Sequence, residues 1–166
     1  MDVKLVRYDG QTDVAVGLIQ AFWQSHNQYT PSHQEALEDL SAWTAKGHCL
    51  YLISHQQTYV GFVHLGSRGC EMDWLEDIFV LPALQGKGIG SEAIRQVEAI
   101  VKAYSETLYI KAAAKNDRAV RLYHRLGYTC LNTITIRKDF RPEKYQTVGV
   151  ERIMGLDLDV KQDKGS

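Results

Sequence analysis

The feature that most constrains the fold is a strand that leads through three closely spaced glycines into an amphipathic helix. Residues 72–80 are predicted to form a strand, and Gly86, Gly88 and Gly90 follow it. Residues 88–103 are predicted to be helical, because apolar side chains recur along one face: Ile89, Ala93, Ile94, Val97, Ile100 and Val101. A strand that passes directly into a packed helix is typical of α/β folds.

The elements around this unit indicate the rest of the fold. We expect strands at residues 3–8, 49–54, 58–65, 107–113, 128–136 and 148–156, and helices at residues 12–26 and 118–126. A further helix should begin after Ser32, with Ser32 as N-cap and Glu35 as its capping-box partner, and should end at Gly47. This order predicts an α/β (α+β) fold with a mixed sheet of about seven strands and helices on both faces.

Size and composition fit one folded domain. The chain has 166 residues, of which 45% are hydrophobic and 23% charged, as in ordinary globular proteins. We see no internal repeat and no linker, so we expect a single domain over residues 1–160 and a polar tail over residues 161–166.

Charge, hydropathy and cysteine content indicate which classes of partner are not expected. The net charge is -1 and no basic patch stands out, so no nucleic-acid partner is expected. No apolar run reaches the roughly 20 residues that span a bilayer, and the N-terminus lacks a signal-peptide apolar region, so no membrane partner is expected either. Cys49, Cys70 and Cys130 share no metal-ligand spacing. They are expected to be free thiols in a cytoplasmic protein without a metal site.

The glycines at residues 86, 88 and 90 predict an anion site. Without Cβ atoms their main-chain N–H groups can close on an anion, and the start of the following helix adds unpaired donors and a partial positive charge. Lys87 adds a positive side chain. The spacing fits neither the Walker loop nor the dinucleotide fingerprint, because Gly88 follows the Gly-Lys pair and Gly90 comes one residue early. A phosphate or pyrophosphate is the natural ligand.

Two motifs together resemble the GNAT superfamily of acyl-CoA N-acyltransferases. Gln85 to Gly90, after a strand that ends near Pro82, matches the family pattern Q/R-x-x-G-x-G/A. A second pattern, N-x-x-A-x-x-L-Y-x-x-x-G-F/Y, is matched at every position: Asn116, Ala119, Leu122, Tyr123, Gly127 and Tyr128. The two motifs cover residues 75–128, in the family's order, and are far more specific together than either is alone.

The resemblance implies a GNAT-like fold in which two central parallel strands, residues 72–80 and 107–113, splay apart around acetyl-CoA. The pyrophosphate would sit on the main-chain amides of the glycine loop, and the pantetheine arm would pair with β-strand main chain. The residues assigned to acetyl-CoA are Phe79, Val80, Leu81, Gln85, Gly86, Lys87, Gly88, Ile89, Gly90, Ser91, Asn116, Ala119 and Tyr123. No metal cofactor is implied.

The same resemblance suggests the catalytic groups. Family members usually work by direct attack of a neutral amine on the thioester, and alkylamines with a pKa of about 10 must first lose a proton. By the family pattern, Tyr123 would protonate the departing thiolate and Glu76 would act as the base. Asp77 would bind the substrate, although adjacent strand residues point to opposite faces unless a bulge intervenes. Trp23, His26 and Tyr29 are expected in the acceptor wall, and His64 is a weaker candidate.

The sequence therefore predicts an enzyme, an acetyl-CoA-dependent N-acetyltransferase. Residues 75–80 and 88–92 are closest to the diamine and polyamine branch, so a small primary amine of that kind is the expected acceptor. Protein or peptide acetylation, aminoglycoside acetylation, and a non-catalytic acyl-CoA-binding regulatory module remain as alternatives. A homodimer is compatible with the family pattern.

Overall fold

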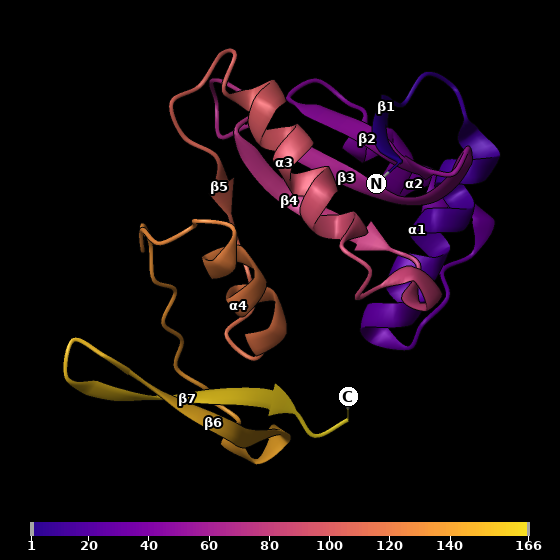
Figure 1. Ribbon diagram of the computed structural model, residues 1–166. Helices are drawn as coiled ribbons and strands as arrows, with labels where there is room; N and C mark the ends of the chain where they lie inside the picture. The colour runs from indigo at the N-terminus through magenta and orange to yellow at the C-terminus, as the bar shows by residue number, and fades with distance from the viewer. Residues whose placement is uncertain (1, 166) are drawn as a thin grey trace. The chain divides into compact units, whose positions relative to one another are not determined.

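The computed structural model describes residues 2–165. The chain divides into two compact units, Met1–Lys111 and Ala112–Ser166 (Figure 1). The elements of the first unit are β1 (Val3–Arg7), α1 (Thr12–Asn27), α2 (His33–Trp43), β2 (His48–His55), β3 (Thr58–Gly66), β4 (Trp74–Val80), the 3-10 turn η1 (Pro82–Leu84), α3 (Ile89–Val101) and β5 (Tyr109–Ile110).

The first unit is built on a five-stranded sheet with the order β1-β2-β3-β4-β5. The first four strands are antiparallel neighbours, whereas β4 and β5 are parallel and pair only at Trp74↔Tyr109 and Leu75↔Ile110. The sheet is thus mixed, as predicted, but the strand expected at 107–113 is shortened to two residues. Within residues 2–165, the β5 edge of β4 has no strand partner from residue 76 onward.

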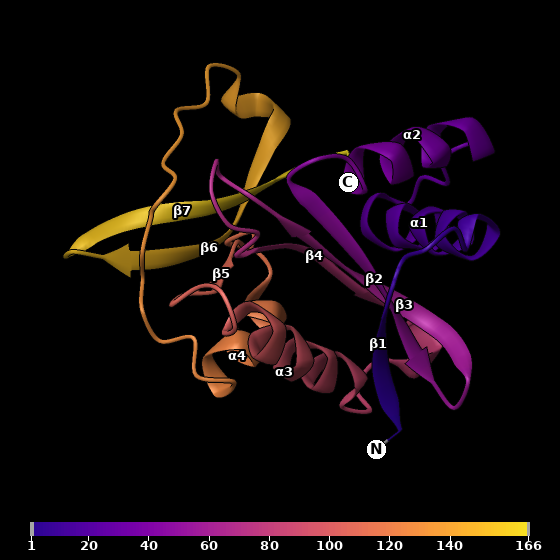
Figure 2. The same cartoon turned by 90° about the horizontal axis from the view of Figure 1, so that it is seen from above.

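Helices cover both faces of this sheet, which confirms the predicted mixed α/β architecture. Figure 2 shows α1 and α2 on one face and α3 on the other. On the α1 face, the ring of Phe22 lies 5.5 Å from that of Phe62 and 5.8 Å from that of Phe79. On the α3 face, the predicted apolar stripe is buried at Ile89, Ala93, Ile94, Val97 and Val101. Burial of each large apolar side chain stabilises the fold by about 1.5–3 kcal/mol.

The capping box predicted at the start of α2 is present. The Glu35 N–H donates to Ser32 Oγ at 3.2 Å, and the Ser32 N–H donates to the Glu35 carboxylate at 2.7 Å. The helix ends at Trp43, before the expected stop at Gly47. The Thr44 hydroxyl donates to the Leu40 carbonyl at 2.8 Å, which satisfies one of the helix-end acceptors in place of a glycine cap.

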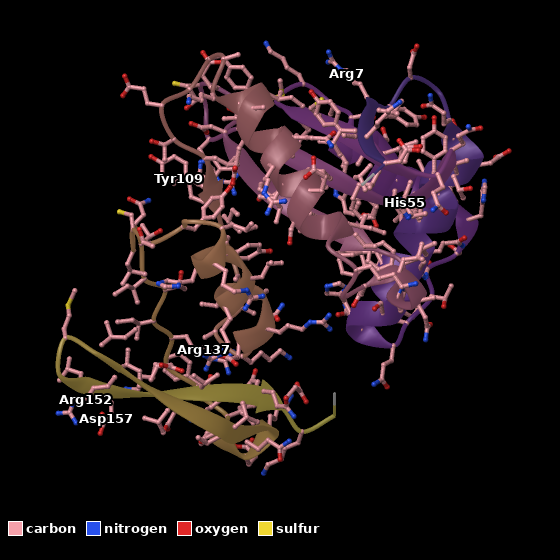
Figure 3. The ribbon with its side chains drawn as sticks, in the orientation of Figure 1. Arg7, His55, Tyr109, Arg137, Arg152 and Asp157 are labelled. Carbon is pink, nitrogen blue, oxygen red and sulfur yellow. The ribbon has the colours of Figure 1, made fainter. Side chains whose placement is uncertain are left out.

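The second unit contains α4 (Asp117–Arg125), the 3-10 turn η2 (Pro142–Lys144), β6 (Tyr145–Ile153) and β7 (Leu156–Asp163). The strands form an antiparallel hairpin around Met154 and Gly155, which both have positive φ, as two-residue hairpin turns require. Arg152 and Asp157 face each other across this hairpin at 3.6 Å (Figure 3).

Two strand predictions in this unit were wrong. Residues 128–136 form no strand, and the expected strand 148–156 is divided between β6 and β7 by their turn. Apolar alternation describes how side chains would fit a pleated surface, but it does not supply the neighbouring strand. The seven strands therefore form sheets of five and two. β7 continues to Asp163, beyond residue 160, and the single-domain interpretation stays a prediction.

Candidate active site

The glycine loop is tied directly to the end of β4. The 3-10 turn η1 follows the strand, and the Leu84 N–H donates to the Leu81 carbonyl at 2.8 Å. The Gln85 side chain turns back and donates to the Val80 carbonyl at 2.8 Å. These short-range bonds fix where the chain leaves the sheet, and so where the loop meets the first turn of α3.

The loop has the backbone of an anion cradle. Gly86 and Gly88 have φ values of 77° and 84°, which only glycine adopts without strain. A Cβ at Gly86 would meet no atom within 4 Å. Gly88 is the N-cap of α3 and supplies no side-chain acceptor to the first turn of that 13-residue helix. This open, donor-rich geometry fits a pyrophosphate, which helix N-termini favour.

The exposure of each residue in this loop shows whether its side chain or only its main chain could contact a ligand. Gln85, Gly86, Lys87 and Gly88 are exposed, whereas the Ile89 side chain is only 1% exposed and lies in the core. Ile89 can therefore contact a cofactor only through its main chain. Gly90 and Ser91 are half-buried. We call residues Gln85 to Gly90 the loop site.

The end of β4 offers main-chain groups along one edge. The Leu81 N–H donates to the Val60 carbonyl at 2.9 Å, so it belongs to the β3 side of the strand. Successive N–H groups of a strand alternate in direction, which places that of Val80 on the opposite edge, the one shared with β5. This edge is where an extended ligand could add as a strand.

A β-bulge in β4 changes the expected arrangement of Glu76 and Asp77. His64 pairs with Asp77 and Leu65 with Leu75, so Glu76 is an extra residue with no partner in the β3 register. A Cβ at Gly66 would collide with the Glu76 carboxylate, and Gly66 faces the same side of β3 as His64. The bulge thus brings both carboxylates to one face, where strict alternation would separate them.

Glu76 is held by an arginine that the sequence did not indicate. Arg68, from the β3–β4 connection, contacts both carboxylate oxygens of Glu76, with the second bond at 3.0 Å. Its guanidinium lies 4.5 Å from the centre of the Trp74 ring. The Arg68 hydrogen bond lowers the pKa of Glu76; burial opposes this, and the charges of Arg68, His64 and His48 add to it. Glu76 as the catalytic base remains a prediction, and this pairing makes it a weaker one.

Asp77 ends a chain of three titratable side chains from three adjacent strands. His64 Nδ1 lies 2.8 Å from Asp77 Oδ2, and His64 Nε2 lies 2.8 Å from His48 Nδ1. His64 is only 4% exposed, and the ring of Trp43 stacks on it at 4.9 Å. We call this set the histidine chain. Sequence reasoning missed His48 completely, because only the register of β2 and β3 brings it to His64.

Two of the predicted acceptor residues, Trp23 in α1 and Tyr29 just after that helix, contact carboxylates of α2. The Trp23 indole N–H donates to Asp39 at 2.7 Å, and the Tyr29 hydroxyl lies 2.9 Å from both Glu35 oxygens. The Glu35 hydrogen bond raises the pKa of Tyr29. His26 instead contacts the Phe22 carbonyl at 3.0 Å.

A row of rings continues from this end of α1 to the histidine chain. The Phe22 ring lies 5.0 Å from Trp23 and 6.0 Å from Trp43, which stacks on His64. Trp23, His26 and the residues around Asp77 therefore belong to one packed layer, whereas Tyr29 is exposed.

Asn116 and Tyr123 belong to the second unit. Asn116 is the N-cap of α4, and its side-chain oxygen accepts from the Ala119 N–H at 3.2 Å. The Tyr123 ring lies 6.2 Å from that of Tyr128 in an edge-to-face contact. The second motif thus has a local structural role in starting α4, and the contacts of Asn116, Ala119 and Tyr123 with acetyl-CoA stay predictions.

Comparison with known proteins identifies the family. The model of the acetyltransferase (GNAT) family matches residues 16–128. No significant match is found among curated proteins. An integron cassette protein from the mobile metagenome of V. cholerae has a similar structure, with a TM-score of 0.68 at 19% identity over 84% of this chain and 93% of that one.

Two aminoglycoside acetyltransferases share the fold. AAC(6')-Iy, in complex with the bisubstrate analogue CoA-S-monomethyl-acetylneamine, has a TM-score of 0.64 at 18% identity, covering 84% of this chain and 99% of that one. AAC(6')-Ig from Acinetobacter haemolyticus has a TM-score of 0.60 at 19% identity, covering 84% and 98%.

The family match spans more than half of the chain and includes both the loop site and the second motif. The mixed α/β fold is the fold of these acyltransferases. The chain belongs to the GNAT family of acetyltransferases and is an acetyl-CoA-dependent N-acetyltransferase.

Proposed function

We propose that this enzyme acetylates a primary amine of a small molecule with several positive charges, such as a diamine or polyamine. The observation that carries the proposal is the pairing of aromatic rings with carboxylates around the end of α1: Trp23 with Asp39, and Tyr29 with Glu35. Carboxylates and aromatic faces both attract ammonium groups. Asp77, in the same packed layer, adds a third carboxylate.

The cofactor half of the site supports acetyl transfer itself. We propose that the loop site holds the pyrophosphate of acetyl-CoA and that Phe79, Val80 and Leu81 align the pantetheine arm along the open edge of β4. Bound acetyl-CoA supplies the activated acetyl group. The Val80 N–H is our candidate donor to the oxyanion that forms during acyl transfer. Tyr123 is our candidate for protonating the thiolate that leaves.

Aminoglycoside acetylation is the second candidate. AAC(6')-Iy and AAC(6')-Ig have the same fold. Aminoglycosides, like polyamines, carry several positively charged amino groups. The carboxylate and aromatic pairs of α1 and α2 suit either acceptor, so acceptor size separates the two. A homodimer and a cytoplasmic location stay predictions.

The test is thiol release from acetyl-CoA across a panel of amines. The panel contains a short diamine, spermidine, an aminoglycoside, a lysine-containing peptide and a neutral monoamine of similar size. Turnover should be highest with the diamine or spermidine. Preferential acetylation of the peptide would overturn the proposed acceptor class, and preference for the aminoglycoside would establish the second candidate.

A matched pair of variants tests the carboxylates themselves. Glu35→Gln with Asp39→Asn should raise KM for spermidine about 10-fold, because two attractive charges are lost. Glutamine at residue 35 preserves the capping box. Glu38→Gln is the control, since Glu38 lies on the same helix and its carboxylate contacts Gln34. If Glu38→Gln raised KM for spermidine as much as the double variant does, only the net charge of the protein would matter.

A further inference from the structure

We propose that the histidine chain His48–His64–Asp77 carries the proton of the acceptor amine away from the site, with Asp77 facing the amine. This inference rests on the acetylation of an amine proposed above. In it His64 and His48 are positioning residues, because they act through Asp77.

The geometry of the chain supports a relay. Both ring nitrogens of His64 are occupied by titratable partners, each at 2.8 Å, and neither hydrogen-bonds a main-chain group of residues 2–165. His64 is buried, whereas Asp77 keeps a side-chain exposure of 27% and His48 is half-buried. The chain therefore has two accessible ends and a protected centre, and the stacked Trp43 ring holds the central imidazole in plane.

The reaction requires one proton to leave. An alkylammonium loses two protons when its nitrogen forms the new C–N bond and the C–S bond of the thioester breaks. One of these protons ends on the sulfur of CoA. The other must reach solvent, because alkylamines with a pKa of about 10 are mostly protonated at pH 7.

The chain can hold that proton on any of its three groups and keep its hydrogen bonds. The extra proton can reside on Asp77, on His64 or on His48, and in each case one hydrogen remains between every pair of neighbours. A proton accepted at Asp77 is therefore balanced by release of a proton from His48 Nε2. The three groups then return to their starting charge states, and both imidazoles shift their hydrogen from Nδ1 back to Nε2 before the next proton passes.

Of the two carboxylates on this face, Asp77 is the one that belongs to the histidine chain, because Glu76 is paired with Arg68. Glu76 lies on the same face, but the Arg68 guanidinium binds both of its oxygens and lowers its pKa. The charged or titratable groups facing His64 are thus Asp77 and Glu76 from β4, His48 from β2 and the paired Arg68. Helix α2 contributes only the ring of Trp43.

The test compares His48→Asn with His55→Asn. The amide of Asn can replace the Nδ1 contact with His64, but it cannot pass a proton on. His55 lies on the same strand, and its Nδ1 contacts the Asp2 carbonyl at 2.9 Å, so His55→Asn should behave as wild type. We expect His48→Asn to lower kcat about 10- to 100-fold at pH 7, with KM for acetyl-CoA unchanged.

The pH profile distinguishes a relay from a structural role. The deficit of His48→Asn should shrink as the pH approaches the pKa of the amine, about 10, because the amine then arrives neutral. Added imidazole should partly restore His48→Ala at pH 7. His64→Asn, which keeps a donor toward Asp77, should show the same pH-dependent deficit. A deficit that is equal at every pH, or no deficit, would overturn the relay while leaving the amine acetylation intact. Thiol release by the wild-type enzyme that no amine of the panel increases would instead remove the proposed function, and the relay with it.

Discussion

The carboxylate cluster lies in the middle of β4 and the loop site follows the end of the same strand, yet the two are built in different ways. The loop site is contiguous, and its bonds join residues at most five positions apart, as between Gln85 and Val80. The carboxylate cluster of Glu76 and Asp77 is completed by Arg68, His64 and His48, which come from other segments. A contiguous site can be recognised from a motif, whereas an assembled site depends on register.

The largest effect should follow from filling the loop site. Gly88→Val should weaken CoA binding at least about 100-fold, because a branched side chain is strained at φ 84° and would project into the anion cradle. Gly10→Val is the matched control: Gly10 has φ 85°, and a Cβ there meets no atom within 4 Å. Calorimetry that found the same CoA affinity for both variants would remove the loop from the cofactor site.

Tyr123→Phe tests whether this residue of the second family motif acts in catalysis or in CoA binding. It should lower kcat about 10- to 100-fold and leave CoA affinity within about threefold, because only the proton donor is lost. Tyr128→Phe is the control, since the family motif accepts Phe there and its ring lies 6.2 Å from that of Tyr123. If kcat and CoA affinity fell by similar factors, Tyr123 would be a CoA-binding residue and not the proton donor.

Ser32→Ala tests a second contiguous feature, outside the loop site. Loss of the capping box should lower the free energy of unfolding by about 1 kcal/mol without changing KM for acetyl-CoA. Ser41→Ala, at an exposed position of the same helix, should be nearly neutral. Urea unfolding checks both variants, and equal destabilisation by the two would argue against the cap.

The smallest effect should come from the Glu76–Arg68 pair. Glu76→Gln should lower the free energy of unfolding at pH 7 by less than about 1 kcal/mol. Because the folded-state pKa of Glu76 is lowered, this stabilisation is complete above the unfolded pKa of about 4.3 and is lost as the pH falls through the lower folded value. Urea titrations of wild type, both single variants and Arg68→Met/Glu76→Gln measure the coupling. A difference that persisted at the lowest pH would show that lost packing, and not charge, is responsible.

The helices and the loop were predictable because their signals are local. The capping box at Ser32 and the apolar stripe of α3 appear as predicted, within a few residues at each end. Strands were less predictable, since a strand exists only where another strand pairs with it. Residues 128–136 have the alternation of a strand but no partner, and β5 keeps only Tyr109 and Ile110.

The sequence by itself determined the family and the backbone of the loop site, because glycine spacing and helix starts act through the backbone of neighbouring residues. The tertiary structure decided the partner of each carboxylate. One extra residue in β4 turned Glu76 and Asp77 to the same face, and the registers of β2, β3 and β4 gave one of them an arginine and the other a histidine. Such contacts join residues distant in the chain, and no local pattern encodes them.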